Sequence, residues 1–167
     1  MKKIGLLSDT HGFLHPRVKV FLKDCDEIWH AGDVGDIQVL EDLKLIAPIR
    51  VVFGNIDNSL IRENWPEDAI FGIEGLKVYM THIGGYPGRY QARARQLIDA
   101  HLPDIFISGH SHILKVMPDK KRRLLHINPG AAGNNGYHKS ITAIRFVLDR
   151  GNIDDLEVFD LDRKKKY

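Results

Sequence analysis

The N-terminal part of the chain repeats one order of segments: a short apolar run, a polar loop and an amphipathic stretch. The apolar runs Ile4–Leu7, Glu27–His30 and Arg50–Phe53 have the length of strands. The amphipathic stretches have apolar residues at helical spacing, and we expect one helix to begin at Pro16 and the next to end before Pro48. Strands that alternate with helices in this way predict a parallel sheet with crossover helices.

The second half of the chain predicts mainly strands. Ile70–Ile73 and Leu76–Thr81 flank Glu74-Gly75, which is expected to form the two-residue turn of a β-hairpin. One helix is predicted from about Tyr90 to His101. Further strands are predicted at Ile105–Ser108, Leu114–Met117, Leu124–Ile127, Ile141–Leu148 and Ile153–Phe159.

The chain is expected to form one domain. Its apolar fraction of 43% is typical of globular proteins, and no Gly/Ser-rich linker, repeat or low-complexity segment divides the 167 residues. We therefore predict a single domain over residues 1–167. The expected fold class is α/β, with two mixed β-sheets packed face to face and helices outside.

Charge restricts the range of partners. The chain has 24 Lys and Arg residues against 22 Asp and Glu residues, and the net charge of +2 argues against a protein that coats nucleic acid. Two basic runs, Lys120–Arg123 and Arg163–Lys166, are expected to be a solvated turn and a frayed tail. A nucleic-acid contact is the alternative, but aromatic residues do not interleave with these runs.

One cysteine, Cys25, excludes an internal disulfide and a cysteine-based zinc cluster, and we expect it to be a buried apolar side chain. This composition fits the reducing cytoplasm. The first apolar run ends at Ser8, short of the roughly 7–15 apolar residues of a secretory signal. No stretch approaches the ~18 apolar residues that span a bilayer, so no membrane partner is expected.

Five predicted strands each end in a loop whose side chains can bind a metal ion. The carboxyl ends of strands in an open parallel sheet border one crevice, so these loops are expected to converge although they are far apart in sequence. His110 and His112 alternate and would point to the same side of an extended segment. The candidate metal ligands are Asp9, His11, Asp33, Asn55, His82, His110 and His112.

These residue types match a two-metal hydrolytic site. Imidazole, carboxylate and amide ligands together suit manganese, zinc or iron. Two such ions lower the pKa of a shared water and neutralise charge on phosphoryl oxygens, so no serine or cysteine nucleophile is needed. Each short motif alone is better explained by a turn or a cap, and the prediction depends on their joint occurrence at five strand ends.

The order of these motifs resembles the calcineurin-like metallophosphoesterase superfamily, and the resemblance covers nearly the whole chain. It implies a four-layer αββα sandwich. The short length and three motifs resemble the small bacterial and archaeal YfcE-type phosphodiesterase branch: Asp9-Thr10-His11-Gly12, His30-Ala31-Gly32-Asp33 and Asn128-Pro129-Gly130.

The resemblance also implies how two divalent metal ions would be held. Manganese is the expected ion, with nickel, iron or zinc as alternatives, and hydrolysis would use a hydroxide that bridges the metals. The branch further implies a homodimer or homotetramer. One ion would be bound by Asp9, His11 and His112, and the other by Asn55, His82 and His110, with Asp33 bridging them.

Two positions depart from the wider superfamily. Strong phosphomonoesterases carry a histidine after the asparagine, which protonates the leaving group, whereas this chain has Ile56. The departure puts turnover of poor leaving groups in doubt and fits the YfcE-type branch. Ile83 follows His82 where many relatives have glycine, and we expect an adapted loop that retains the metal.

Several other polar residues have two open interpretations. His30 is either an acid or orienting group at the site or, more simply, a structural histidine. Asp57 either orients Asn55 or a bound water, or caps a turn. His138 either contacts the substrate phosphate from the rim, together with Asn55, or is a surface histidine. The remaining histidines are expected to be structural: His15, His101 and His126.

We predict a dinuclear metal-dependent phosphoesterase that hydrolyses a small phosphodiester. The missing proton donor argues against ordinary phosphomonoesters, and the near-neutral charge argues against a nuclease acting on long nucleic acid. The alternatives are a phosphomonoesterase, a nuclease, or a metal-binding interaction scaffold on the same fold. A scaffold is free to lose metal ligands, whereas this chain retains all seven.

Overall fold

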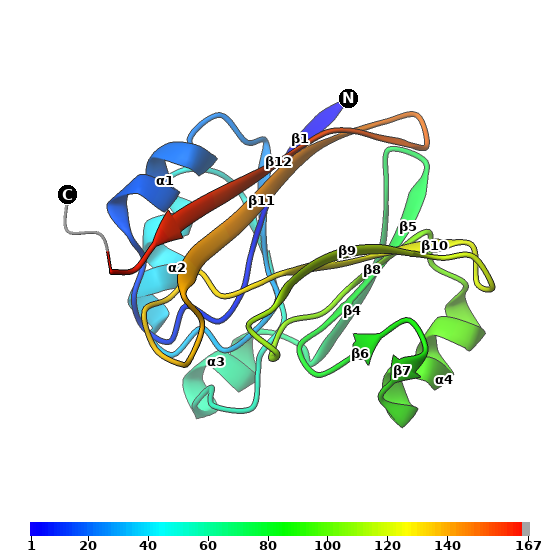
Figure 1. Cartoon of the computed structure of the whole chain (residues 1–167), viewed down its shortest axis with the longest axis horizontal. Helices are drawn as coiled ribbons and strands as arrows, with labels where there is room; N and C mark the ends of the chain where they lie inside the picture. Colours follow the sequence, from blue (N-terminus) through cyan, green and yellow to red (C-terminus); the bar gives the residue numbers. More distant parts are fainter. Residues whose placement is uncertain (165–167) are drawn as a thin grey trace.

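The computed structural model describes residues 1–164 and contains two five-stranded sheets. The first sheet has the order β12-β11-β1-β2-β3 (Figure 1). In it, β1 runs parallel to β2 and antiparallel to β11, and β2 runs parallel to β3. Its strands are β1 (Lys2–Leu7), β2 (Glu27–His30), β3 (Ile49–Val51), β11 (Ser140–Asp149) and β12 (Asn152–Asp162).

The second sheet has the order β4-β5-β8-β10-β9. Its central strand β8 runs parallel to both neighbours, whereas the outer pairs β4–β5 and β9–β10 are antiparallel. The prediction of two mixed sheets is thus confirmed. The strands are β4 (Asp68–Ile73), β5 (Leu76–Thr81), β8 (Ile105–Ile107), β9 (Leu114–Asp119) and β10 (Leu124–Pro129).

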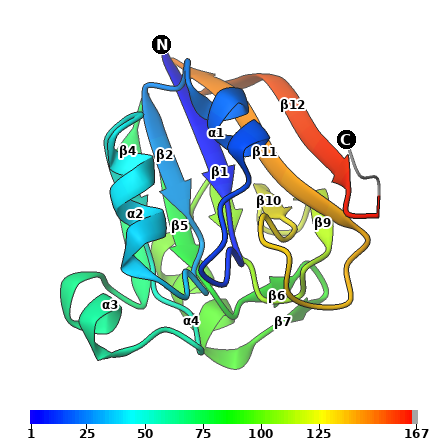
Figure 2. The same ribbon diagram turned by 90° about the vertical axis from the view of Figure 1, so that its left-hand side faces the viewer.

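Helices cover the outer face of each sheet, which gives four layers (Figures 1 and 2). Val18, Leu22, Leu40 and Leu43 of α1 and α2 pack on the first sheet. Ala94 and Ile98 of α4 pack on the second sheet. The helices are α1 (Pro16–Leu22), α2 (Ile37–Lys44), α3 (Ser59–Asn64) and α4 (Ala92–His101), and a small hairpin pairs β6 (Gly85–Tyr86) with β7 (Arg89–Tyr90).

The inner faces of the two sheets pack directly on each other. Trp29 and Phe146 of the first sheet are fully buried in this layer together with Ile107 of the second sheet. Burial of large apolar side chains contributes about 1.5–3 kcal/mol each, so this layer fixes how the two sheets lie relative to each other. The αββα sandwich is confirmed.

Several segment predictions need correction at their ends. The third strand is Ile49–Val51, because the chain leaves the sheet before Phe53 to form the metal-site loop. The last long helix begins at Ala92, because Tyr90 pairs with Gly85 in the small hairpin. Neither α3 nor this hairpin was predicted. The turn at Glu74-Gly75 is confirmed, and both of its residues adopt positive φ.

Cys25 is buried as predicted, and burial raises the pKa of its thiol to about 11. The run Lys120–Arg123 is the turn between β9 and β10. Arg163 was expected in a frayed tail but is fixed, and its backbone N–H donates to the Lys139 carbonyl at 3.0 Å. Lys165 and Lys166 lie outside the described residues. Within residues 1–164, no helix is long and apolar enough to cross a membrane.

His126 makes stability depend on pH. Its buried ring stacks on Phe106 and has Nδ1 3.2 Å from the Phe106 carbonyl oxygen, and burial lowers the pKa of His126 to about 4. In the unfolded chain, His126 therefore binds a proton near pH 6.5, whereas in the folded chain it stays neutral until the pH is much lower. As pH falls from 7 to 5, this group should remove about 2 kcal/mol of unfolding free energy.

The expected result is that His126→Gln weakens this pH dependence. The measurement is urea unfolding at pH 7 and pH 5, with a chelator present so that metal loss does not contribute. His101→Gln, which removes an exposed histidine, is the control and should keep the wild-type dependence. Equal loss of stability in wild type and His126→Gln would contradict the prediction.

Candidate metal centre

The candidate ligands lie in loops that follow β1, β2, β3, β5 and β8, at the carboxyl ends of strands from both sheets (Figure 2). Backbone hydrogen bonds join these loops to one another. The Asp9 N–H donates to the Gly32 carbonyl at 3.0 Å, and the Gly109 N–H donates to the His82 carbonyl at 2.9 Å. The loops are therefore fixed by main-chain contacts before any side chain is considered.

Six of the seven predicted ligands form two groups of three. Within each group, one ligand atom per residue lies within 4.8 Å of the others. The groups are Asp9, His11 and His112, and Asp33, His82 and His110. We refer to them as the first triad and the second triad.

Asp33 lies between the two triads. Its Oδ1 is 3.2 Å from His82 Nε2 in the second triad, and its Oδ2 is 3.6 Å from His11 Nε2 in the first. Asp9 Oδ1 is 3.2 Å from His112 Nε2 and 3.9 Å from His82 Nε2. One carboxylate thus presents a separate oxygen to each triad.

Three buried polar atoms at this centre have no hydrogen-bond partner within the described residues: Asp9 Oδ1, His11 Nε2 and His82 Nε2. An unpaired buried polar atom costs about 1–3 kcal/mol, so native proteins rarely keep one without a reason. Here the three atoms converge on the same space. Carboxylate oxygens and imidazole nitrogens are also the donor set of manganese, iron and zinc sites, so these residues fit divalent ions.

The backbone of the centre is strained. Asp9, His11, Asp33, His110 and His112 all adopt φ between 47° and 68°. The left-handed region costs a residue other than glycine roughly 1–2 kcal/mol. Strain of this kind concentrates at functional sites, where the surrounding structure enforces it.

Two glycines make the close approach of the loops feasible. A Cβ on Gly54 would lie 2.1 Å from Asp33 Oδ1, and a Cβ on Gly109 would lie 2.2 Å from Ser8 Oγ. Any side chain at either position would displace a carboxylate or the serine that holds one. Ser8 Oγ donates to Asp9 Oδ2 at 2.6 Å, a role that the sequence analysis missed.

The electrostatics favour ionised carboxylates. Burial opposes ionisation of Asp9, but contacts with His11 and His112 outweigh it and lower the pKa of the carboxyl. For Asp33, burial is likewise outweighed, mainly by His82, so the pKa is lowered. Burial opposes protonation of His82, but Asp33 and Asp9 raise its pKa in turn. Protons and metal ions would therefore compete for the same imidazoles.

Hydrogen bonds fix the tautomers of two histidines in the triads. His82 Nδ1 lies 2.8 Å from the Ala31 carbonyl, which can only accept, so Nδ1 carries the proton and Nε2 keeps a free lone pair. His138 Nε2 donates to the Gly133 carbonyl at 2.9 Å. Its Nδ1 must then accept from His112 Nδ1 at 3.1 Å, which directs the lone pair of His112 Nε2 toward Asp9.

Both ring nitrogens of His138 are engaged within the protein, one by His112 and the other by the Gly133 carbonyl. The predicted contact of His138 with substrate phosphate stays a prediction. Arg163 holds the loop that carries it. The guanidinium donates to the carbonyls of Asn134, Gly136 and His138.

His30 and Asp57 form hydrogen bonds with the loops that carry the candidate ligands. His30 is fully buried, its Nδ1 accepts from the Gly32 N–H, and its Nε2 donates to Thr10 Oγ1 at 2.9 Å, so it is structural. The Asp57 carboxylate accepts from the N–H groups of Gly35 and Gly54, at 2.8 and 2.7 Å. It therefore ties the loop after β2 to the loop after β3. The remaining histidines lie outside the triads: His15, His101 and His126.

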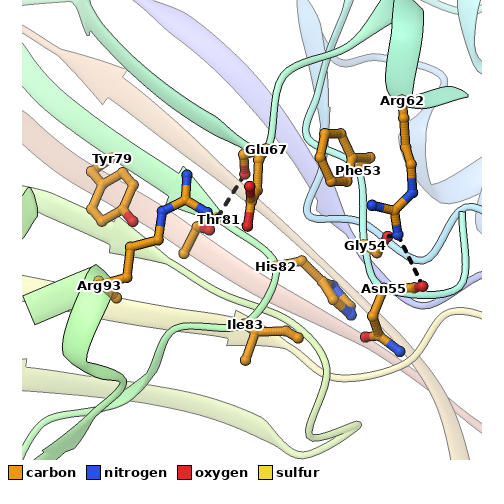
Figure 3. Close-up of a pocket in the computed structure, with 11 residues that line it drawn as sticks. Phe53, Gly54, Asn55, Arg62, Glu67, Tyr79, Thr81, His82, Ile83 and Arg93 are labelled. Carbon is orange, nitrogen blue, oxygen red and sulfur yellow. Dashed lines mark hydrogen bonds and ion pairs between the residues drawn. The ribbon is translucent and has the colours of Figure 1, made fainter.

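Asn55, the seventh predicted ligand, is exposed beside His82 at the edge of a cavity of about 160 Å³ (Figure 3). Arg62 and Arg93 line the same cavity, which we call the arginine cavity. Arg62 donates to the carbonyls of Gly54, Asn55 and Asp57 and so shapes the Asn55 loop. The sequence analysis missed this role, although an arginine on a capped helix directly after the loop was a usable signal.

Two comparisons relate the chain to curated proteins. A probable metallophosphoesterase of Methanothermobacter thermautotrophicus is 31% identical over 135 residues, which cover 77% of this chain and 76% of the relative. A probable metallophosphoesterase of Methanocaldococcus jannaschii is 35% identical over 135 residues, covering 77% and 67%.

Solved structures share the fold. YfcE, a phosphoesterase from E. coli, matches with a TM-score of 0.59 and 19% identity, covering 93% of this chain and 98% of that one. Vps29 from Entamoeba histolytica, complexed with Zn²⁺, matches with a TM-score of 0.64 and 19% identity, covering 95% and 98%.

A family model of the calcineurin-like phosphoesterase superfamily domain matches residues 1–152, which include both triads. This match covers all the strand-end loops and every strand of the two sheets except β12. The chain belongs to the calcineurin-like phosphoesterase superfamily.

Proposed function

We propose that this chain is a dinuclear metal-dependent phosphodiesterase. The observation that carries the proposal is the position of Asp33, whose two carboxylate oxygens face the nitrogen ligands of two separate triads. Asp9, His11 and His112 would hold one ion, and Asn55, His82 and His110 the other, with Asp33 shared. When bound, the two ions would supply a hydroxide nucleophile and neutralise phosphoryl oxygens.

Manganese is the proposed ion, because the site combines two carboxylates and an amide with its imidazoles. Nickel, iron and zinc remain chemically compatible, and the Zn²⁺ complex of Entamoeba histolytica Vps29 supports a divalent ion on this fold. We further propose that the chain acts as a single domain in a reducing cytoplasm, which the buried thiol of Cys25 supports.

The chain's own residues prepare the site before substrate arrives. His82 and His112 have their tautomers set by Ala31 and His138, so their Nε2 lone pairs need no rearrangement. The Ile56 N–H donates to Asp33 Oδ1 at 3.1 Å and orients the shared carboxylate. Such preorganisation lowers the cost of forming a site during reaction.

A preference for activated diesters follows from the lack of a side chain that could protonate the leaving group. Ile56, 46% exposed, stands where strong phosphomonoesterases place a proton donor. His30 is buried and His138 is hydrogen-bonded at both nitrogens, so neither replaces that donor. The best substrates would carry a leaving group that departs without protonation.

Backbone strain argues against a scaffold that has lost catalysis. Five left-handed ligand residues together cost several kcal/mol, an expense of about 1–2 kcal/mol each that a purely structural surface has no reason to maintain. An intact set of orphaned ligand atoms supports the enzyme in the same way.

Replacing the shared carboxylate tests the centre directly. Asp33→Ala and His110→Ala should each reduce bound metal below two ions per chain and abolish hydrolysis of bis(p-nitrophenyl) phosphate, because ligand atoms of the second triad are lost. Elemental analysis and a manganese-dependent assay measure both. Asp24→Ala and His101→Ala, which alter exposed residues away from the centre, are the controls. Full metal content and activity in Asp33→Ala would refute the proposal.

His138→Phe tests the tautomer relay. Loss of the acceptor for His112 Nδ1 should weaken Mn²⁺ binding by about 10- to 100-fold, the usual effect of removing a group that orients a ligand. His138→Gln can still accept a hydrogen bond and should restore part of the affinity. Calorimetric titration of the metal-free protein measures this, and wild-type affinity in His138→Phe would contradict the assigned role.

Ile56→His should add the missing proton donor. We expect hydrolysis of diesters with alkyl leaving groups to rise at least about 10-fold, within the range of general acid catalysis, while p-nitrophenyl esters change little. Ile56→Asn, which is polar but cannot act as an acid, is the matched control. An equal effect of both variants on both ester types would show that protonation of the leaving group does not limit the reaction.

A further inference from the structure

One cavity at the candidate metal centre is lined by His110, His112 and Tyr137, and two further cavities border the centre and share Ile83. Of the two that share Ile83, the arginine cavity includes His82, whereas the other includes His110, and these two ligands belong to the same triad with ring centroids 5.3 Å apart. We call the second one the apolar cavity. Its walls include Ile83, Tyr86, His110, Ser111, Ile113 and Lys115.

The charged groups of the arginine cavity already have protein partners. Arg62 donates to three backbone carbonyls, two of them those of Gly54 and Asn55 (Figure 3), and Arg93 forms ion pairs with Glu67 and Asp68. A substrate group that bound there would have to compete with these contacts. The arginine cavity is therefore a poor candidate for recognising a part of the substrate.

The apolar cavity differs in its exposed apolar side chains, although its cation, Lys115, also has a protein partner in the Tyr86 ring. Ile83, Tyr86 and Ile113 are 42%, 36% and 62% exposed, so large apolar surfaces remain in water beside a metal ligand. Lys115 Nζ lies 3.8 Å from the centroid of the Tyr86 ring. An apolar wall with one cation suits an aromatic group, whose ring face attracts a cation and whose burial removes apolar area from water.

Size restricts the occupant further. The apolar cavity has a volume of about 140 Å³. An apolar cavity of about 150 Å³ accommodates benzene in a well-studied protein. The volume therefore fits a single six-membered ring.

The geometry of phosphoryl transfer places such a ring here. In an in-line displacement the attacking and leaving oxygens lie on opposite sides of phosphorus, so the second ester group of a diester projects sideways. A phosphoryl group beside His110 would direct that second group along the protein surface, and the apolar cavity opens at His110 itself. A phosphomonoester has no such group.

We propose that the apolar cavity is the subsite for the ester group that stays on phosphorus, and that this group is a single-ring aromatic. The proposal rests on the phosphodiesterase function proposed above. Tyr86, Ile113 and Lys115 determine specificity: the first two provide apolar contact, and Lys115 provides the cation.

Two substrates with the same leaving group test the subsite. Wild-type protein should hydrolyse phenyl p-nitrophenyl phosphate with a kcat/KM about 10-fold above that of methyl p-nitrophenyl phosphate, the usual gain from one apolar pocket. Tyr86→Ala and Ile113→Ser should remove most of this ratio through KM and leave the methyl ester within about twofold. Leu45→Ala, which removes an exposed apolar side chain that lines neither cavity, is the control, and metal content should equal that of wild type throughout.

A binding experiment separates this proposal from the proposed function. Calorimetry should show that phenylphosphonate binds the metal-loaded protein about 10-fold more tightly than methylphosphonate, and that Tyr86→Ala loses the difference. If neither diester is hydrolysed but this difference appears and is lost in the variant, the subsite stands and the phosphodiesterase function fails. If diesters are hydrolysed without preference for phenyl, or with a preference that both variants retain, the subsite is refuted.

Discussion

The candidate metal centre depends on one constraint, the burial of two carboxylates, those of Asp9 and Asp33. Taking an ionised group out of water costs several kcal/mol unless an opposite charge compensates. The four imidazoles of the triads surround these carboxylates, and the Nδ1 atoms of His82 and His112 face Ala31 and His138. Divalent ions held by the two triads would supply the missing compensation, and the strand ends of both sheets contribute the ligands.

The sequence was sufficient to predict that six of the seven candidate ligands would lie close together, and the reason is topological. Carboxyl ends of parallel strands share an edge, so polar residues directly after apolar runs had to lie near one another. It was not sufficient to predict how they meet. An Asp or His residue in a sequence does not indicate a left-handed backbone conformation, whereas a glycine often does. The hydrogen bond from His112 to His138 joins two residues that are 26 positions apart. Contacts of that kind depend on the packed structure.

The same division applies to the fold. β2 was predicted at its observed bounds, and the sandwich followed from the alternation of strands and helices together with the family resemblance. The helix α3 has six residues, too few for a helical period to show, and β6 and β7 have two residues each. Elements of this size form because their neighbours hold them. The cap of Asn58 on Ile61 N–H stabilises α3, and the contacts of Arg62 link that helix to the Asn55 loop.

The hydrogen bonds from Arg163 to the loop before β11 have a consequence for the order in which the site is completed. Asp9 and His11 lie near the start of the chain, yet the ring that orients His112 is held in place by a residue that follows β12. His138 precedes β11, but Arg163, which holds the loop of His138, is synthesised only after β12. The orientation of His112 is therefore complete only when the last strand of the first sheet is in place.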